Sequence, residues 1–247
     1  MARTLNPDNV VDEFVDDANG SLARFTRLYT LIEGGANAHR PEKQALAADA
    51  AFRLGILWET FVHRWHVAAI SKSPDVFVAR VAGDLGKELA KGELGAKLEA
   101  LTPGCTAVPD RPTKDQIEGL LDPLRRNVTF KDNETWIKHA KADLDGVYAN
   151  KVSSIVSTRE DACIIALIKG LRNYLAHKSP AGLTHFNALI RAENNGLGLV
   201  GQVNKPLVRA ERDARDVAVY LHRTVGGKRR VEHLYSRVTD VAQAMKV

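Results

Sequence analysis

Residues 157–177 read STREDACIIALIKGLRNYLAH, and this stretch predicts one long helix with an apolar face. Its apolar residues recur three and four positions apart, as on the buried side of a helix: Ile164, Ile165, Leu167, Ile168 and Leu171. Ser157 and Glu160 have the spacing of a capping box, which predicts where the helix starts. Pro180 follows closely, so we expect the helix to end near His177 and to leave the imidazole at the mouth of a cleft.

The same apolar spacing continues along most of the chain and predicts an all-α fold, with a helical bundle as the architecture. We expect further helices over about residues 7–32, 41–71, 74–90, 132–148, 207–224 and 229–245, and a short helix that begins at a Thr113/Gln116 capping box. Gly226 and Gly227 predict a hinge between the last two helices. Residues 196–203 predict a short extended piece or hairpin, and strand signals are too few for a sheet.

The charge balance of the chain is mildly basic, with 35 Lys and Arg against 30 Asp and Glu, a net charge of +5 and a pI near 9.2. Such an excess favours polyanions without indicating a basic tail. The two cysteines have no disulfide or zinc-ligand spacing, and nothing indicates a metal or another cofactor. The acidic N-terminus is unlike a signal peptide and no run reaches about 18 apolar residues, so we expect a cytoplasmic protein with no membrane segment.

The end of the motif helix carries side chains suited to metal-free cleavage of RNA. The imidazole of His177 can take and give a proton near neutral pH, and the guanidinium of Arg172 can bind a phosphate. Asn173 lies four residues before His177, on the same helical face, and is expected to orient the imidazole or to donate to a phosphate oxygen. Lys178 is a second candidate for a phosphate contact. Arg172 lies roughly 140° around an ideal helix from His177, a gap that its length or a frayed last turn must close.

These residues resemble the Arg-Asn-x3-His motif of the HEPN superfamily, all-helical domains of which many members are ribonucleases. Arg172, Asn173 and His177 match the motif position by position. Residues 58–62, Trp-Glu-Thr-Phe-Val, look like the aromatic and acidic segment on the first core helix of bacterial HEPN proteins. Some HEPN toxins carry a tyrosine two positions after the histidine, where this chain has Ser179, so the resemblance does not extend to control by nucleotidylation of that tyrosine.

The resemblance implies a metal-independent endoribonuclease that acts as a homodimer on an RNA substrate. One protomer supplies one histidine, and pairing would bring Arg172 and His177 against their copies in one cleft. Glu59 is then expected beside the site, as a partner of Arg172 or His177. A toxin or antiviral effector is the implied role, held in check by an antitoxin or another regulatory protein.

The chain of 247 residues is expected to form a single helical domain. By the same resemblance, its HEPN-like core covers about residues 41–91 and 131–191. Residues 92–130 are then an insertion or lid, and residues 206–247 a C-terminal helical extension.

Several other patterns have alternative interpretations. Glu59, His63 and His66 share a helical face and could bind a metal, although polar residues on an interface or cleft wall are the favoured interpretation. The aromatic residues Trp58, Phe61, Trp65 and Trp136 are expected in the core rather than as base-stacking residues. The basic runs at 228–230 and 125–126 are favoured as solvated faces over RNA contacts, and the glycines of 196–201 lack the setting of a dinucleotide fingerprint. A non-catalytic helical module that binds a nucleotide or a protein is the alternative function, and a DNA-binding regulator is a weaker one.

Overall fold

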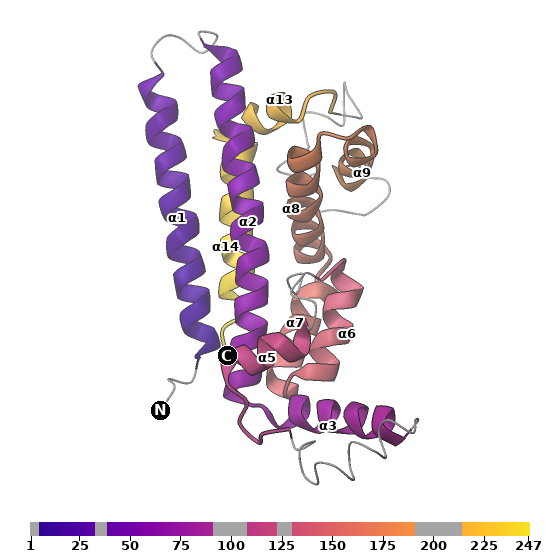
Figure 1. Cartoon of the computed structure of the whole chain (residues 1–247). Helices are drawn as coiled ribbons and strands as arrows, with labels where there is room; N and C mark the ends of the chain where they lie inside the picture. The colour runs from indigo at the N-terminus through magenta and orange to yellow at the C-terminus, as the bar shows by residue number, and fades with distance from the viewer. Residues whose placement is uncertain (1–4, 33–38, 91–107, 123–129, 191–213) are drawn as a thin grey trace. The chain divides into compact units, whose positions relative to one another are not determined.

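A computed structural model shows an all-α chain, as the sequence predicts (Figure 1). It describes residues 5–32, 39–90, 108–122, 130–190 and 214–247. The described part contains α1 (Pro7–Leu31), α2 (Arg40–Lys72), α3 (Asp75–Ala90), α5 (Lys114–Leu121), α6 (Asn133–Asp143), α7 (Gly146–Ser157), α8 (Arg159–His177), α9 (Pro180–Ile190), α13 (Val217–His222), β1 (Thr224–Val225), β2 (Lys228–Arg229) and α14 (Arg230–Gln243). The extended piece predicted at 196–203 lies outside the described residues, and so do parts of the segment 92–130.

Two compact units divide the described residues. The first unit contains the chain up to Val10, residues Val62–Ser153 and Val247, and the second unit contains Val11–Phe61 and Ser154–Lys246. The prediction of a single domain with a HEPN-like core stays a prediction.

Helices α1, α2 and α14 pack together in the second unit through a core of aromatic side chains. The ring of Phe14 lies 5.8 Å from that of Trp58 and 4.6 Å from that of Phe61. The hydroxyl of Tyr235, on α14, donates to the carbonyl of Ala50 at 2.9 Å. Trp58 and Phe61 are buried, as are Trp65 and Trp136 in the first unit, which confirms their prediction as core residues. This packing fixes the position of the middle of α2.

The helix predicted over 132–148 is wrong, because the chain breaks there into α6 and α7. Asp132 caps α6 with its side chain, which accepts from the Thr135 N–H at 2.7 Å. Leu144 is extended, and the side chain of Asp145 accepts from the Val147 N–H at 3.0 Å. The first N–H groups of a helix have no partner within the helix. The side chain of Asp145 accepts from one of them, the Val147 N–H, and this stabilises the start of α7.

The predicted start and surroundings of the motif helix also need correction. Ser157 does not cap α8; it is the last residue of α7, and its hydroxyl donates to the Ser154 carbonyl at 2.8 Å. Helix α8 begins two residues later, at Arg159. Pro180 does follow the end of α8, but it also opens α9, because proline fits the first position of a helix, where an N–H partner is missing in any case.

The hinge predicted at Gly226 and Gly227 is a tight β-hairpin. Both glycines have positive φ, 58° and 85°, and they connect β1 to β2. Two consecutive residues with positive φ form the two-residue turn that matches the twist of antiparallel strands. Of the helix predicted over 207–224, residues 207–213 lie outside the described residues, and α13 begins at Val217.

A buried carboxylate, Asp143, links three helices of the first unit. Arg80 Nε, from α3, lies 2.6 Å from Asp143 Oδ1. His66 Nε2, from α2, and His139 Nδ1, from α6, each lie 3.5 Å from Asp143 Oδ2. Asp143 is only 1% exposed and His66 is fully buried. The carboxylate therefore organises the local packing of α2, α3 and α6.

The titration of this cluster makes the first unit sensitive to acid. Burial alone would raise the pKa of Asp143, but His66, Arg80 and His139 outweigh it and hold that pKa below its ordinary value. Burial lowers the pKa of His66, against the opposing effect of Asp143. In both cases the unfolded chain binds more protons than the folded one, so the free energy of unfolding decreases as the pH is lowered. The effect of His66 begins below about pH 6.5 and that of Asp143 below about pH 3.9.

We predict that Asp143→Asn lowers the free energy of unfolding by about 2–3 kcal/mol, because Arg80 loses its buried countercharge. Asp84→Asn is the matched control, since Asp84 also pairs with Arg80 but is half exposed, and about 0.5 kcal/mol is expected for it. Urea unfolding of both variants measures the difference. Equal losses in the two variants would contradict a buried pairing.

Candidate functional site

The motif helix α8 is anchored by its apolar face. Its five predicted core residues are all buried: Ile164, Ile165, Leu167, Ile168 and Leu171. The helix ends at His177, as predicted, and Lys178 follows with a left-handed backbone at φ 47°. The Lys178 N–H donates to the Tyr174 carbonyl at 2.6 Å, which closes the last turn. The motif residues thus lie on the last turn and a half of a well-packed helix.

Arg172 crosses from α8 to α2 and is held there by Glu59. Its Nε lies 3.2 Å from Glu59 Oε2, and the two side chains are 32% and 19% exposed. The aliphatic stem passes over Gly55, one turn before Glu59 on α2. The predicted neighbour of the motif is therefore next to Arg172, while its role in any reaction stays a prediction.

The backbone of α2 and the stem of Arg172 approach so closely that only glycine fits at position 55. A Cβ built on Gly55 would lie 2.5 Å from the Arg172 Cβ, closer than two carbons can pack. Gly55 is not among the site residues predicted from the sequence. In the sequence it stands out only as a glycine in the interior of a long helical pattern, and such a glycine often permits close packing.

Asn173 connects the guanidinium to the exposed side of the helix. Its Oδ1 accepts from Arg172 Nη1 at 3.1 Å. The predicted gap of roughly 140° around the helix between Arg172 and His177 is reduced by this bond. The guanidinium of Arg172 reaches Asn173, which lies one turn before His177. Of the two roles predicted for Asn173, orienting the imidazole is not the contact observed. No described residue bonds its amide nitrogen, which can donate to a ligand.

His177 and Lys178 are exposed at the corner between α8 and α9. Among the described residues, neither side chain has a hydrogen bond or an ion pair. Helix α9 starts at Pro180, where the Ser179 hydroxyl accepts from the Gly182 N–H at 3.1 Å. The N-terminal end of a helix carries partial positive charge, so the start of α9 adds to Lys178 in favouring an anion at this corner.

The three residues considered as a possible metal site have separate partners. Glu59 pairs with Arg172, His63 Nε2 lies 3.3 Å from Glu118 Oε1, and His66 pairs with Asp143. In the ranges that the structure covers, no group of three or more His, Cys, Asp or Glu is arranged to hold a metal ion.

The basic run at 228–230 is not the solvated face that its sequence indicates. Arg230 is fully buried, and its Nη1 donates to the Tyr220 carbonyl at 2.9 Å. Arg229 stacks 3.5 Å over the ring of Tyr29 and pairs with Glu232. Two of the three cations therefore stabilise the hairpin and its surroundings. The run at 125–126 lies outside the described residues.

Comparison of the chain with family models, with curated proteins and with solved structures gives no match. Among the described helices, none combines the length and the apolar character needed to cross a membrane.

We predict opposite effects from alanine at two helical glycines of the second unit. Gly55→Ala should lower the free energy of unfolding by about 1–3 kcal/mol, because the added methyl displaces Arg172. Gly20→Ala is the control, since a Cβ at that position would meet nothing within 4 Å, and it should stabilise by about 0.5–1 kcal/mol. Thermal unfolding of both variants tests this. Stabilisation by Gly55→Ala would show that α2 and α8 are not in close contact there.

Proposed function

We propose that this protein is a metal-independent endoribonuclease in which His177 transfers protons and Arg172 binds the phosphate. The observation that carries the proposal is the arrangement at the end of α8, where an exposed imidazole lies one turn from an Asn173–Arg172 pair that Glu59 orients. The resemblance of these residues to the HEPN motif supports it.

The reaction requires little from the protein. The 2′-oxygen of the ribose attacks the adjacent phosphorus, and the bond from phosphorus to the 5′-oxygen breaks, which leaves a 2′,3′-cyclic phosphate. A base removes the 2′-hydroxyl proton and an acid protonates the departing 5′-oxygen. A general acid or base contributes typically about 10² to 10⁴-fold to the rate, and donors directed at the developing charge contribute further.

Arg172 is suited to donating hydrogen bonds to the charge that develops on the phosphate. The carboxylate of Glu59 lies 3.2 Å from Nε as an ion-pair partner, and Asn173 accepts from Nη1. Among the described residues Nη2 has no partner, so it can donate to a phosphate oxygen. An arginine held on two sides loses little side-chain entropy when the phosphate arrives. Lys178 and the start of α9 provide further attraction for the anion.

One histidine does not supply both a base and an acid at once, and the proposal therefore includes a homodimer in which two motifs share a cleft. The cellular role that we propose is that of a toxin or antiviral effector whose activity an antitoxin or another regulatory protein restrains. This role derives from the resemblance.

We predict that the purified protein cleaves RNA in the presence of EDTA and leaves 2′,3′-cyclic phosphate ends. His177→Ala and Arg172→Ala should each lower the cleavage rate by at least about 10²-fold, because each removes one of the two chemical functions. His185→Ala is the control, as this exposed histidine lies on α9 outside the motif, and full activity is expected. Gel analysis of end-labelled RNA with end-group mapping measures all four proteins.

Equal activity in wild type and His177→Ala would exclude the proposed chemistry, as would cleavage that EDTA abolishes. The Glu59–Arg172 pair also suits the second candidate, a non-catalytic helical module, since an arginine paired with a carboxylate is a common structural contact. No cleavage by the wild type, together with loss of stability in Arg172→Ala, would favour that module.

A further inference from the structure

Tyr174 is a partly exposed aromatic residue next to the candidate site. It lies three residues before His177, so the two side chains are neighbours on one face of α8, with about 5–6 Å between their Cβ atoms. A Cβ built on Gly182 would lie 3.5 Å from Cδ2 of Tyr174, so one edge of the ring rests against the first turn of α9. The tyrosine is therefore held between the two helices that form the corner at the motif.

Tyr174 differs from the other four tyrosines of the chain in its contacts. Each of the others has an aromatic, cationic or hydrogen-bonding partner: Tyr29, Tyr148, Tyr220 and Tyr235. Among the described residues, the ring of Tyr174 stacks on no other ring or cation, and its hydroxyl forms no hydrogen bond. A partly exposed ring without such a partner is free to stack on a planar ligand.

The chemistry of the proposed reaction brings a base to this ring. The 2′-oxygen that attacks the phosphorus belongs to a ribose that also carries a base. A phosphate held by Arg172 beside His177 therefore places that base at the same corner. Tyr174 is the only Phe, Tyr or Trp residue of α8, and Phe186 of α9 is buried. Of these two rings on the motif helices, Tyr174 alone can be reached by the base.

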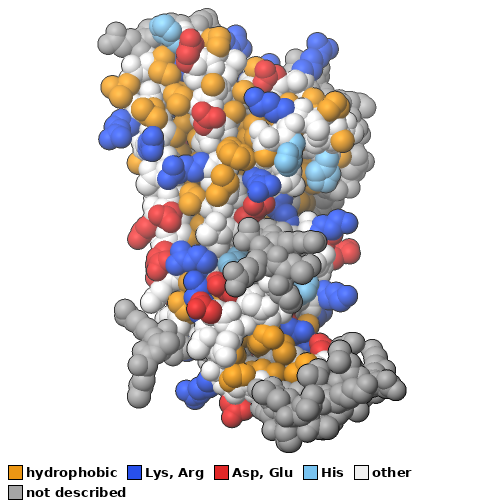
Figure 2. Space-filling view, in the orientation of Figure 1, with side chains coloured by type: hydrophobic (Ala, Val, Ile, Leu, Met, Phe, Trp, Pro, Cys, Tyr) orange, Lys and Arg blue, Asp and Glu red, His pale blue; other side chains and the backbone are white. Residues whose placement is uncertain are grey.

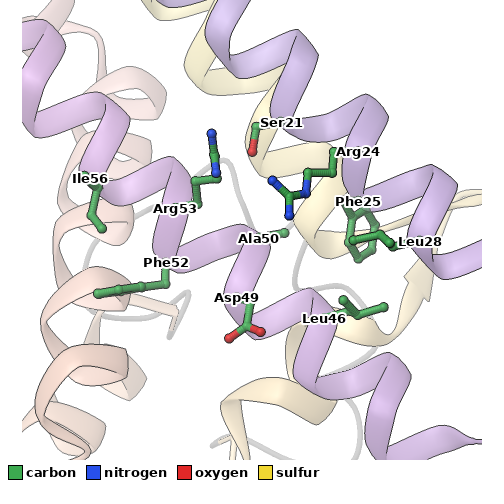
Figure 3. Close-up of a pocket in the computed structure, with 10 residues that line it drawn as sticks. All are labelled: Ser21, Arg24, Phe25, Leu28, Leu46, Asp49, Ala50, Phe52, Arg53 and Ile56. Atoms are coloured by element: carbon green, nitrogen blue, oxygen red, sulfur yellow. The ribbon is translucent and has the colours of Figure 1, made fainter.

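The groove between α1 and α2 offers a larger apolar surface, but in a different place (Figure 3). Figure 2 shows hydrophobic side chains gathered over the upper part of these two helices, with Lys and Arg side chains among them. The groove has a volume of about 540 Å³, and its lining includes Leu28, Leu46 and Ile56. The described residues that line it all belong to α1 and α2, so a base in this groove would not lie beside His177.

We propose that Tyr174 stacks on the base of the nucleotide whose 2′-hydroxyl attacks, and that the site therefore takes single-stranded RNA. This inference rests on the proposed function, because it names the substrate class of the same site. A base in an RNA duplex is already paired and stacked on its neighbours, and only an unstacked base can lie on a protein ring. Every base has a π-face, so the preference is for single strands and not for one base.

Binding of RNA to the full-length His177→Ala variant tests the stacking without cleavage. In this background Tyr174→Leu should raise the dissociation constant for a single-stranded RNA of mixed sequence at least about fivefold, because leucine still packs against Gly182 but cannot stack on a base. Tyr174→Phe should bind nearly as tightly as the tyrosine, since it keeps the ring. The dissociation constant for a blunt RNA duplex should not change with Tyr174→Leu. Fluorescence anisotropy measures the binding, and circular dichroism verifies the helical content.

Leu31→Ala is the control in the same background. It removes a large apolar side chain that is 68% exposed at the end of α1, outside the motif. Binding of single-stranded RNA and of duplex should both stay unchanged. A loss in this control equal to that in Tyr174→Leu would show general apolar adhesion of the RNA and would overturn the inference.

Removal of the base gives a second measurement, in the active protein. A DNA oligonucleotide with a single ribonucleotide fixes the linkage that can be cleaved. An abasic ribonucleotide at that position should lower kcat/KM of the wild type at least about fivefold. It should have no further effect in Tyr174→Leu, because the base and the ring take part in one contact, and its loss is counted once.

Equal binding of single-stranded RNA with and without Tyr174→Leu would overturn the inference, and so would a His177→Ala variant that does not bind single-stranded RNA. These results are distinguishable from a failure of the proposed function. RNA that binds through Tyr174 but is not cleaved by the wild type refutes only the nuclease. Cleavage that is equally fast in the wild type and in Tyr174→Leu refutes only the stacking.

Discussion

The close contact between α2 and α8 at Gly55 is the constraint on which the candidate site depends. A glycine there lets the stem of Arg172 lie against the backbone of α2, and this places its guanidinium within reach of Glu59. Any larger side chain at position 55 would move α8 away and separate the two charges. The core of α1, α2 and α14 is what makes α2 rigid enough to define that contact.

The long helices could be predicted because their packing repeats every three to four residues over many turns. Helix α1 and most of α2 have this pattern, while residues 65–70 of α2 are buried without interruption. Both helices begin and end close to the expected residues. The shorter elements could not be predicted in the same way. Asp145, Pro180 and the glycine pair at 226–227 each interrupt the pattern, but an interruption does not say whether a loop, a new helix or a hairpin comes next.

The candidate site, too, could be predicted from the sequence only in part. The nearness of Glu59 to Arg172 is what the resemblance implies, and the exposed end of α8 follows from a pattern within one segment. The need for glycine at position 55 does not, because it arises from a neighbour more than a hundred residues away. Arg230 is a similar case: nothing in a run of three cations indicates that one of them donates to a buried carbonyl and stacks on Tyr220.

The backbone of Lys178 has a consequence for the balance between stability and charge at the turn after α8. Its left-handed conformation costs a residue with a Cβ about 1–2 kcal/mol, and glycine would adopt it freely. The chain instead carries a cation at this position, beside His177. The turn thus gives up some folding free energy and presents a positive group where the two helices meet.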